Sequence, residues 1–348
     1  TFTTNDPLTG EANAGCSTAL TGTAWRNCTF ATPTIPATPP ATGTINRTEA
    51  QEITNFTTWY SYHSTRMKVA KAGASEAFSQ LGATLRIGYD TIHNRSAFDI
   101  PVASNNGVFS GSNRDTWFQR LHDANGNSST PLHGALRRAG EYFKNDTATG
   151  PWGPESGTDQ FTCRQSFAIL TTDGYWNNFN NYGTGQKVGD ADGTDGVEIT
   201  DGITGGRTFT YTPKRPYCDN LSGGSGATCG TSATDTLADV AMAYWKTDLR
   251  DLKNNVPTSS ADEAFWQHMT TFGVSIGLKG TLDPKTELPS ITNGSKRRPD
   301  PTDTENAERI DALWHASVHG RGSFSVAKGK VRVRAVDGSG NVDPSPSF

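Results

Sequence analysis

The sequence lacks long hydrophobic runs and a strong charge of either sign. No apolar run approaches the roughly 20 residues that a helix needs to cross a bilayer, so we expect no transmembrane segment. Charged residues make up only 19% of the chain, the net charge is −4, and no basic cluster is longer than Lys296–Arg298. With a negative net charge and no basic patch, the surface has no positive field that would attract phosphate groups. We therefore expect no nucleic-acid partner.

Nothing at the N-terminus resembles a signal peptide, so we interpret the start at Thr1 as processed or truncated. What the chain does have is 37 glycines and 18 prolines, with Thr, Asn and Ser filling the loops. This composition is typical of a loop-rich extracellular protein. Its 348 residues can bury a sizeable core in one large domain or two moderate ones.

The five cysteines match no zinc-finger or redox spacing. Cys16 and Cys28 form one sequence-local pair, and Cys218 and Cys229 form a second, each across a loop rich in Gly and Thr. We therefore predict two loop disulfides in an oxidising compartment. Cys163 is left over, and we expect any partner of it to lie outside this chain.

The chain starts with an irregular segment and continues with alternating helices and strands. Residues 1–47 include a Pro/Thr-rich run that favours extended conformations. From Thr48 to Leu81, apolar residues at steps of three and four predict one long helix with a buried face. Further helices are expected at 130–143, 235–252 and 307–319, with strands at 83–89, 167–170 and 269–278. This alternation predicts an α/β fold, with a mainly parallel sheet and helices on both faces.

One apolar run ends abruptly in an acidic turn. Phe167–Leu170 suits a strand buried on both faces, and Thr172, Asp173 and Gly174 follow it. Such a turn is also an ordinary way to end a strand. It nevertheless puts the Asp173 carboxylate at the carboxyl edge of the sheet, where open α/β sheets bind their ligands.

A predicted helix start precedes this strand in the chain. Thr130 and Pro131 fit the N-cap and the first helical position, which is a common way to begin a helix. The same geometry could aim the Thr130 hydroxyl at a metal ion held by Asp173. Residue types alone leave both interpretations open.

A second acidic cluster lies in a Gly-rich insertion at residues 177–233. Asp190, Asp192 and Asp195 have a spacing similar to that of calcium loops, but the twelfth position from Asp190 is Asp201 rather than the glutamate of an EF-hand. We expect a solvated loop here, with weak Ca²⁺ binding at a second site as the alternative.

The rival functional class is a metal-dependent hydrolase. His315 and His319 lie four residues apart on a predicted helix and could face one metal ion. They do not form the His-Glu-x-x-His arrangement of zinc proteases. We therefore expect a binding protein rather than an enzyme.

Stretches spread over about residues 48–323 share their sequence with one known family. They are Trp59–Tyr62, Arg66–Lys71, Thr130–Leu132, Cys163–Gln165, Ile169–Trp176, Thr236–Met242, Tyr244–Trp245, Phe265–Met269, Gly280–Asp283, Asp311–Ala316 and Gly320–Gly322. Together they resemble the N-terminal von Willebrand factor A-type domain of the PilY/PilC-type proteins associated with type IV pilus tips. The resemblance implies a Rossmann-like A-type domain at 48–323, with the insertion 177–233. The tail at 324–348 is similar to the end of an immunoglobulin-like or fibronectin-like repeat.

The resemblance also implies a metal site. Such domains hold a divalent cation through an Asp-x-Ser-x-Ser loop after the first strand, a Thr and an Asp. By position, Thr130 and Asp173 match the last two. Oxygen ligands of this kind suit Mg²⁺ or Ca²⁺, with an open position for a partner's carboxylate.

The implied role is that of an adhesin or assembly factor at the pilus tip or outer surface of a bacterial cell. Its expected partners are minor pilins or pilus assembly proteins, and a host or abiotic surface ligand. A purely structural role in the pilus tip is the alternative.

One element of the family pattern is not found. No apolar strand followed by Asp-x-Ser-x-Ser lies upstream of Thr48, so we expect the first central strand to be missing from the chain. Asp337–Asn341 follows a strand with alternating arginines, and Asp343–Ser347 is broken by prolines. We therefore expect an upstream segment, rather than the tail, to complete the metal site.

Overall fold

The computed structural model describes residues 49–93, 97–126, 128–176, 187–219, 229–277, 280–299 and 308–327. Residues 65–329 belong to one compact unit, and helix α2 (Glu49–His63) belongs to another. The predicted segment 1–47, the pair Cys16 and Cys28, and the two C-terminal Asp-x-Ser motifs lie outside the described residues. None of the described helices combines the length and the apolar character needed to cross a membrane.

A parallel sheet lies at the centre of the larger unit, residues 65–329. Its strands are β1 (Ser166–Thr172), β4 (Met269–Ile276) and β5 (Arg321–Ala327), in the order β1-β4-β5. β1 pairs with β4 in register over its whole length, and β4 pairs with β5 with one irregularity after Thr271. The prediction of an α/β fold with a mainly parallel sheet is confirmed. The first residues of the predicted tail, 324–327, belong to β5.

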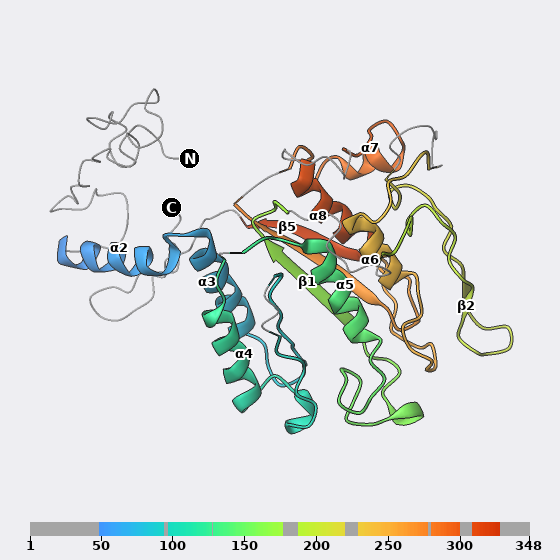
Figure 1. Cartoon of the computed structure of the whole chain (residues 1–348), viewed down its shortest axis with the longest axis horizontal. Coiled ribbons are helices and arrows are strands. Elements are labelled where there is room, and N and C mark those ends of the chain that lie inside the picture. Colours follow the sequence, from blue (N-terminus) through green and yellow to red (C-terminus); the bar gives the residue numbers. More distant parts are fainter. Residues whose placement is uncertain are drawn as a thin grey trace. The chain divides into compact units, whose positions relative to one another are not determined.

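Three helices pack over one face of this sheet: α5 (Leu132–Phe143), α6 (Leu237–Trp245) and α8 (Glu308–His319) (Figure 1). Their apolar sides share one core with Leu170 of β1 and Met269 of β4. On the other face Phe167 and Ile169 are 48% and 54% exposed. The described helices therefore leave this side of β1 open, where the sequence predicted helices on both faces.

The outer edge of β1 pairs with no strand among the described residues. An exposed strand edge offers unpaired backbone groups to another strand. The expected absence of a first central strand stays a prediction, and this edge is where such a strand would pair.

The long helix predicted at residues 48–81 is in fact two helices. α3 (Arg66–Ser79) begins after Thr65, which has an extended conformation and whose hydroxyl accepts a hydrogen bond from the Lys68 N–H at 3.2 Å. A side-chain cap of this kind starts a new helix. Apolar periodicity does not reveal such a local break, because the periodic pattern continues on both sides of it.

A smaller core joins α3 to α4 (Gly111–Asp123). Trp117 of α4 stacks on Phe78 of α3, with ring centroids 4.5 Å apart. The strand predicted at 83–89 is wrong, since Arg86 and Tyr89 form only isolated antiparallel bridges. The remaining short elements are the 3-10 turns Asn105–Gly107 and Gly157–Asp159 and the helix α7 (Leu288–Thr292).

The insertion carries a short antiparallel pair, β2 (Ile199–Thr200) with β3 (Thr208–Phe209). The predicted disulfide between Cys218 and Cys229 is confirmed. Cys163 is exposed and forms no disulfide within the part of the chain that the structure describes. Apolar side chains of the insertion pack against α6 and form a second hydrophobic core with it.

Candidate metal centres

Asp173 lies at the carboxyl end of β1, where the sequence predicted it. Its side chain is 43% exposed. Gly174 follows with a φ of 106°, and a Cβ there would lie 2.8 Å from Cγ1 of Ile310 on α8. Both the backbone conformation and the close approach require glycine. The Asp-Gly turn thus brings the carboxylate to the sheet edge while the chain passes tightly against α8.

The start of α5 lies beside this turn. The ring of His133, in the first turn of α5, packs against Trp176 with centroids 4.7 Å apart. The sequence predicted Thr130 at the N-cap of α5. In the structure the N-cap is Pro131, and Thr130 lies one residue before it. Its carbonyl accepts a hydrogen bond from the Leu132 N–H at 3.0 Å.

Arg66 is the counter-ion of Asp173 in this structure. Its Nη1 lies 3.2 Å from Oδ2 of Asp173, and the two side chains are 59% and 43% exposed. Exposed pairs of this kind contribute about 0–1 kcal/mol. The partners are 107 residues apart in sequence, so no local pattern predicted the pair. A weakly paired, accessible carboxylate is open to exchange of its counter-ion.

The loop at residues 190–195, called the acidic loop below, is fixed by hydrogen bonds to its backbone. Lys246 Nζ donates to the carbonyl oxygens of Ala191 and Thr194 at 2.6 and 2.8 Å. The Tyr211 hydroxyl donates to the carbonyl oxygen of Asp192 at 2.7 Å. Asp192 is fully buried, so the prediction of a solvated loop is wrong for this residue.

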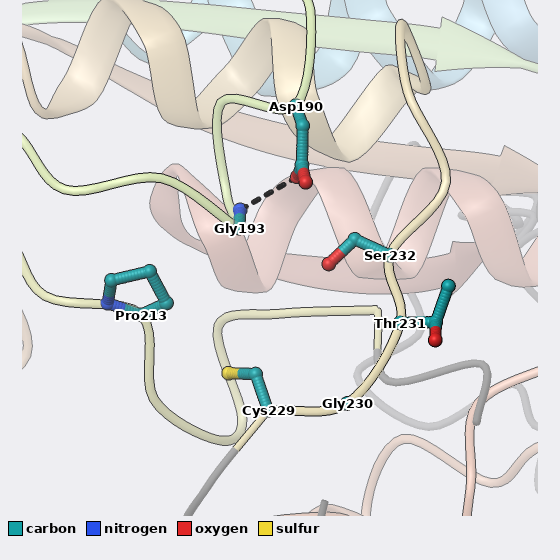
Figure 2. Close-up of a pocket in the computed structure, with 7 residues that line it drawn as sticks. All are labelled: Asp190, Gly193, Pro213, Cys229, Gly230, Thr231 and Ser232. Atoms are coloured by element: carbon teal, nitrogen blue, oxygen red, sulfur yellow. Dashed lines mark hydrogen bonds between the residues drawn. The ribbon is translucent and has the colours of Figure 1, made fainter. Parts of the chain in front are cut away.

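Asp190 lines a pocket of about 550 Å³ (Figure 2). The other lining residues come from the loop after Asp190 and from both sides of the disulfide: Gly193, Pro213, Cys229, Gly230, Thr231 and Ser232. Oδ1 of Asp190 accepts a hydrogen bond from the Gly193 N–H at 2.8 Å. The pocket therefore gives solvent a route to the acidic loop.

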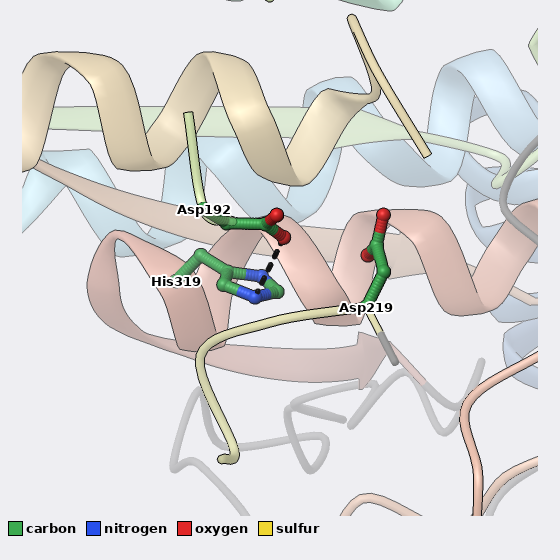
Figure 3. A group of neighbouring side chains, drawn as sticks. All are labelled: Asp192, Asp219 and His319. Atoms are coloured by element: carbon green, nitrogen blue, oxygen red, sulfur yellow. Dashed lines mark ion pairs between the residues drawn. The ribbon is translucent and has the colours of Figure 1, made fainter. Parts of the chain in front are cut away.

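Behind Asp190, the side chains of Asp192, Asp219 and His319 come together (Figure 3). One donor atom of each lies within 4.8 Å of the others, and all three residues are buried. A second group at the same spacing is Asp190, Asp192 and Asp239. Of the three aspartates predicted as a loop site, the structure brings Asp190 and Asp192 together, whereas Asp195 is exposed and belongs to neither group.

Asp239 is the third residue of α6 and forms a capping box with Thr236. Its Oδ2 accepts hydrogen bonds from the backbone and hydroxyl of Thr236, and its Oδ1 accepts one from the Asp192 N–H at 3.1 Å. The Thr-x-x-Asp pattern in the sequence is a signal for this cap. Asp239 thereby holds the backbone of Asp192 in position.

Burial and mutual repulsion raise the pKa values of these carboxyl groups. Burial, followed by the charges of Asp219, Asp239 and Asp190, raises the pKa of Asp192 well above its ordinary value. Burial and the charge of Asp239 raise the pKa of Asp219 to about 7, against the opposing effect of Arg298. Burial raises the pKa of Asp239 to about 6, against its hydrogen bonds. The cluster is thus an environment short of positive charge.

The two histidines predicted as an alternative metal pair lie on α8 and are buried. Burial, and then the charge of Arg298, lowers the pKa of both His315 and His319 well below the ordinary value. Only His319 belongs to a group with metal-ligand spacing in the described residues. No group of three such side chains among the described residues contains both histidines, so their pairing around one metal ion stays a prediction.

The sequence Gly273–Gly277 matches the Gly-x-Ser-x-Gly pattern of serine hydrolases. In those enzymes the serine projects from a sharp turn between a strand and a helix. Here Ser275 is fully buried within β4. This position does not present a nucleophile.

Comparison with known proteins shows relatives of one kind. The chain is 32% identical over 307 residues to the type IV pilus biogenesis factor PilY1 of Pseudomonas aeruginosa strain PAK, covering 79% of this chain. The PilY1 of strain UCBPP-PA14 is 29% identical over an alignment of 358 residues, covering 92% of this chain. The chain is similar to PilY1 over most of its own length. This confirms the resemblance to PilY/PilC-type proteins.

The chain spans only 24% and 28% of the length of these two relatives. No family model and no solved structure matches it. The assignment to a von Willebrand factor A-type domain therefore stays a prediction, which the parallel sheet and its helices are compatible with.

Proposed function

We propose that this chain is a segment of a type IV pilus biogenesis factor, and that its α/β unit binds a protein or surface ligand through a divalent cation. The name of the relatives supports the pilus role. The observation that carries the binding role is the position of Asp173, half exposed at the carboxyl edge of a parallel sheet and beside the start of α5. This edge is where open α/β sheets bind ligands.

In this proposal Thr130 and Asp173 contribute oxygen ligands to Mg²⁺ or Ca²⁺. Both ions accept carboxylate and hydroxyl oxygens and retain positions for other ligands. The ion replaces Arg66 as the counter-ion of Asp173, at little cost because the pair is exposed. Further protein oxygens and an acidic side chain of the partner complete the coordination.

The partners in this proposal are minor pilins or pilus assembly proteins, and a host or abiotic surface ligand. The location is the pilus tip or the outer cell surface. The disulfide between Cys218 and Cys229 supports an oxidising compartment. The proposed role is binding and not catalysis.

The test is the affinity of the chain for purified minor pilins, measured with Mg²⁺ or Ca²⁺ and again after addition of EDTA. We expect Asp173→Ala to weaken binding at least about tenfold, or 1.4 kcal/mol, because it removes the charged ligand of the ion. At a temperature at which the metal-free chain stays folded, EDTA should weaken binding of the wild type to the same level and should not affect the variant further. Asp115→Ala on the exposed side of α4 is the matched control.

Two results would overturn parts of this proposal. If Asp173→Ala binds as the wild type does and EDTA still weakens both, the ion is bound elsewhere. If neither EDTA nor the substitution changes the affinity, the chain is a structural module of the pilus tip.

A further inference from the structure

Three side chains from segments that are far apart in sequence meet beneath the surface of the protein, and none is accessible to solvent. Asp192 comes from the acidic loop, Asp219 follows the disulfide residue Cys218, and His319 ends α8. Asp192, Asp219 and His319 are each 0% exposed. Figure 3 shows Asp192 directed toward the His319 ring, with Asp219 beside them.

The hydrogen bond of His319 defines which ring nitrogen carries the proton. Nδ1 lies 2.8 Å from the carbonyl oxygen of His315. A carbonyl oxygen can only accept, so this contact assigns the proton of the neutral ring to Nδ1 and a lone pair to Nε2, although the carbonyl group of Tyr217 also lies near the ring. Metal-binding histidines are oriented in this way, by donating the other ring N–H to a carbonyl or carboxylate.

The lone pair on Nε2 faces a second acceptor. Oδ2 of Asp192 lies 3.3 Å from Nε2 of His319. Neither oxygen of Asp192 and neither oxygen of Asp219 has a hydrogen bond of ordinary geometry among the described residues, and the nearest donor to Asp219 is the backbone N–H of Ala233. A proton shared between Asp192 and His319 would satisfy one of these atoms but would leave the Asp219 carboxylate with only the Ala233 N–H beside it.

The nearest basic side chains do not pair with these oxygens. Arg298 is buried and its Nη2 donates to the carbonyl oxygen of Pro216. Lys246 donates to carbonyl oxygens of the acidic loop. Neither forms an ion pair with Asp192 or Asp219 within the described part of the chain. Burial of carboxylates without an ion-pair partner is unfavourable, and a cation between them would remove this cost more directly than protonation or the nearby charge of Arg298.

We infer that Asp192, Asp219 and His319 bind one divalent ion of the Zn²⁺ type. Two ligands of tetrahedral Zn²⁺, each about 2.0–2.1 Å from the ion, are separated by about 3.3 Å, which is the spacing of Asp192 Oδ2 and His319 Nε2. An imidazole ligand suits such metals, whereas Ca²⁺ and Mg²⁺ select oxygen ligands. Asp239 is excluded as a main ligand because both of its oxygens already accept hydrogen bonds.

The bound ion has a structural role. It joins the disulfide-linked insertion, through Asp219, to the acidic loop and to the end of α8. The pocket lined by Asp190 reaches the loop that also carries Asp192 (Figure 2). This site is independent of the proposed cation at Asp173, since the two share no residue.

The test begins with the chain freed of metal by EDTA and then equilibrated with Zn²⁺, Mn²⁺, Co²⁺, Ca²⁺ or Mg²⁺. We expect one tightly bound Zn²⁺ per chain by elemental analysis, and a tetrahedral absorption spectrum with Co²⁺. Saturation with Zn²⁺ should raise the Tm by roughly 5–10 °C. His319→Gln and Asp219→Asn should weaken binding by at least about a hundredfold. Glu198→Gln, an exposed carboxylate of the same insertion, is the control and should bind as the wild type does.

Asp219→Asn also separates a lost ligand from a misfolded protein. Without metal it should raise the Tm, because it removes a buried charge, and with Zn²⁺ its Tm should fall below that of the wild type. Asp173→Ala should leave the Zn²⁺ response unchanged, so failure of the proposed function would be recognised separately. The inference is overturned if the wild type neither retains nor responds to Zn²⁺, Mn²⁺ or Co²⁺. It is equally overturned if only Ca²⁺ or Mg²⁺ binds, or if Asp219→Asn binds Zn²⁺ as the wild type does.

Discussion

Trp266→Ala is expected to lower the free energy of unfolding by about 3–5 kcal/mol. Trp266 is fully buried, with its ring centroid 5.5 Å from that of Trp245 and 4.9 Å from that of Phe209. Its Nε1–H donates to the carbonyl oxygen of Trp245 at 2.9 Å. Truncation would leave a cavity between α6 and the insertion and a buried carbonyl oxygen without its donor.

Denaturant unfolding followed by circular dichroism would measure this loss. Ile169→Ala is the control, because Ile169 is 54% exposed on the open side of β1 and should cost less than about 1 kcal/mol. Because Ala191 belongs to the same core as Trp266, the variant should also bind Zn²⁺ more weakly. Equal losses for the two substitutions would contradict the core described for the insertion.

Two glycine-to-alanine substitutions should change stability in opposite directions. At Gly140 in α5 a Cβ would lie 2.3 Å from Cγ of Tyr244 on α6, so the two helices would have to separate. We expect Gly140→Ala to destabilise by about 1–3 kcal/mol. At Gly73 in α3 a Cβ would meet nothing within 4 Å. We expect Gly73→Ala to stabilise by roughly 0.5–1 kcal/mol, because alanine loses less conformational freedom in a helix.

Thermal or denaturant unfolding of both variants beside the wild type would measure the pair. The two changes are chemically identical and both positions are helical, so helix propensity alone predicts stabilisation in each case. A stabilised Gly140→Ala would show that α5 and α6 are not in the close contact described.

Features that depend on neighbouring residues in sequence could be predicted well. The apolar run at residues 167–170 and the β-rich run at 269–278 are strands β1 and β4, and the periodic pattern at 307–319 is helix α8. Each of these patterns spans a whole element, so one mismatched residue does not change the prediction. The disulfide between Cys218 and Cys229 was found for the same reason, since its loop is short.

Features that depend on long-range contacts could not be predicted. Arg66 meets Asp173 across 107 residues, and His319 meets Asp192 across about half of the larger unit. Asp219 carries no spacing that connects it with either, and only the topology of the chain brings them together. Asp195 illustrates the converse, because regular spacing with Asp190 and Asp192 did not bring its side chain into the cluster.

The most direct test of the proposed binding function is a crystal structure of the chain grown with Mn²⁺, which can replace Mg²⁺ and is located by its anomalous scattering. The account predicts an anomalous peak about 2.0–2.6 Å from a carboxylate oxygen of Asp173, the range of Mg²⁺ and Ca²⁺ ligands, with Arg66 turned away. A map without a peak at this carboxylate, in which Arg66 and Asp173 keep their 3.2 Å pair, would contradict it.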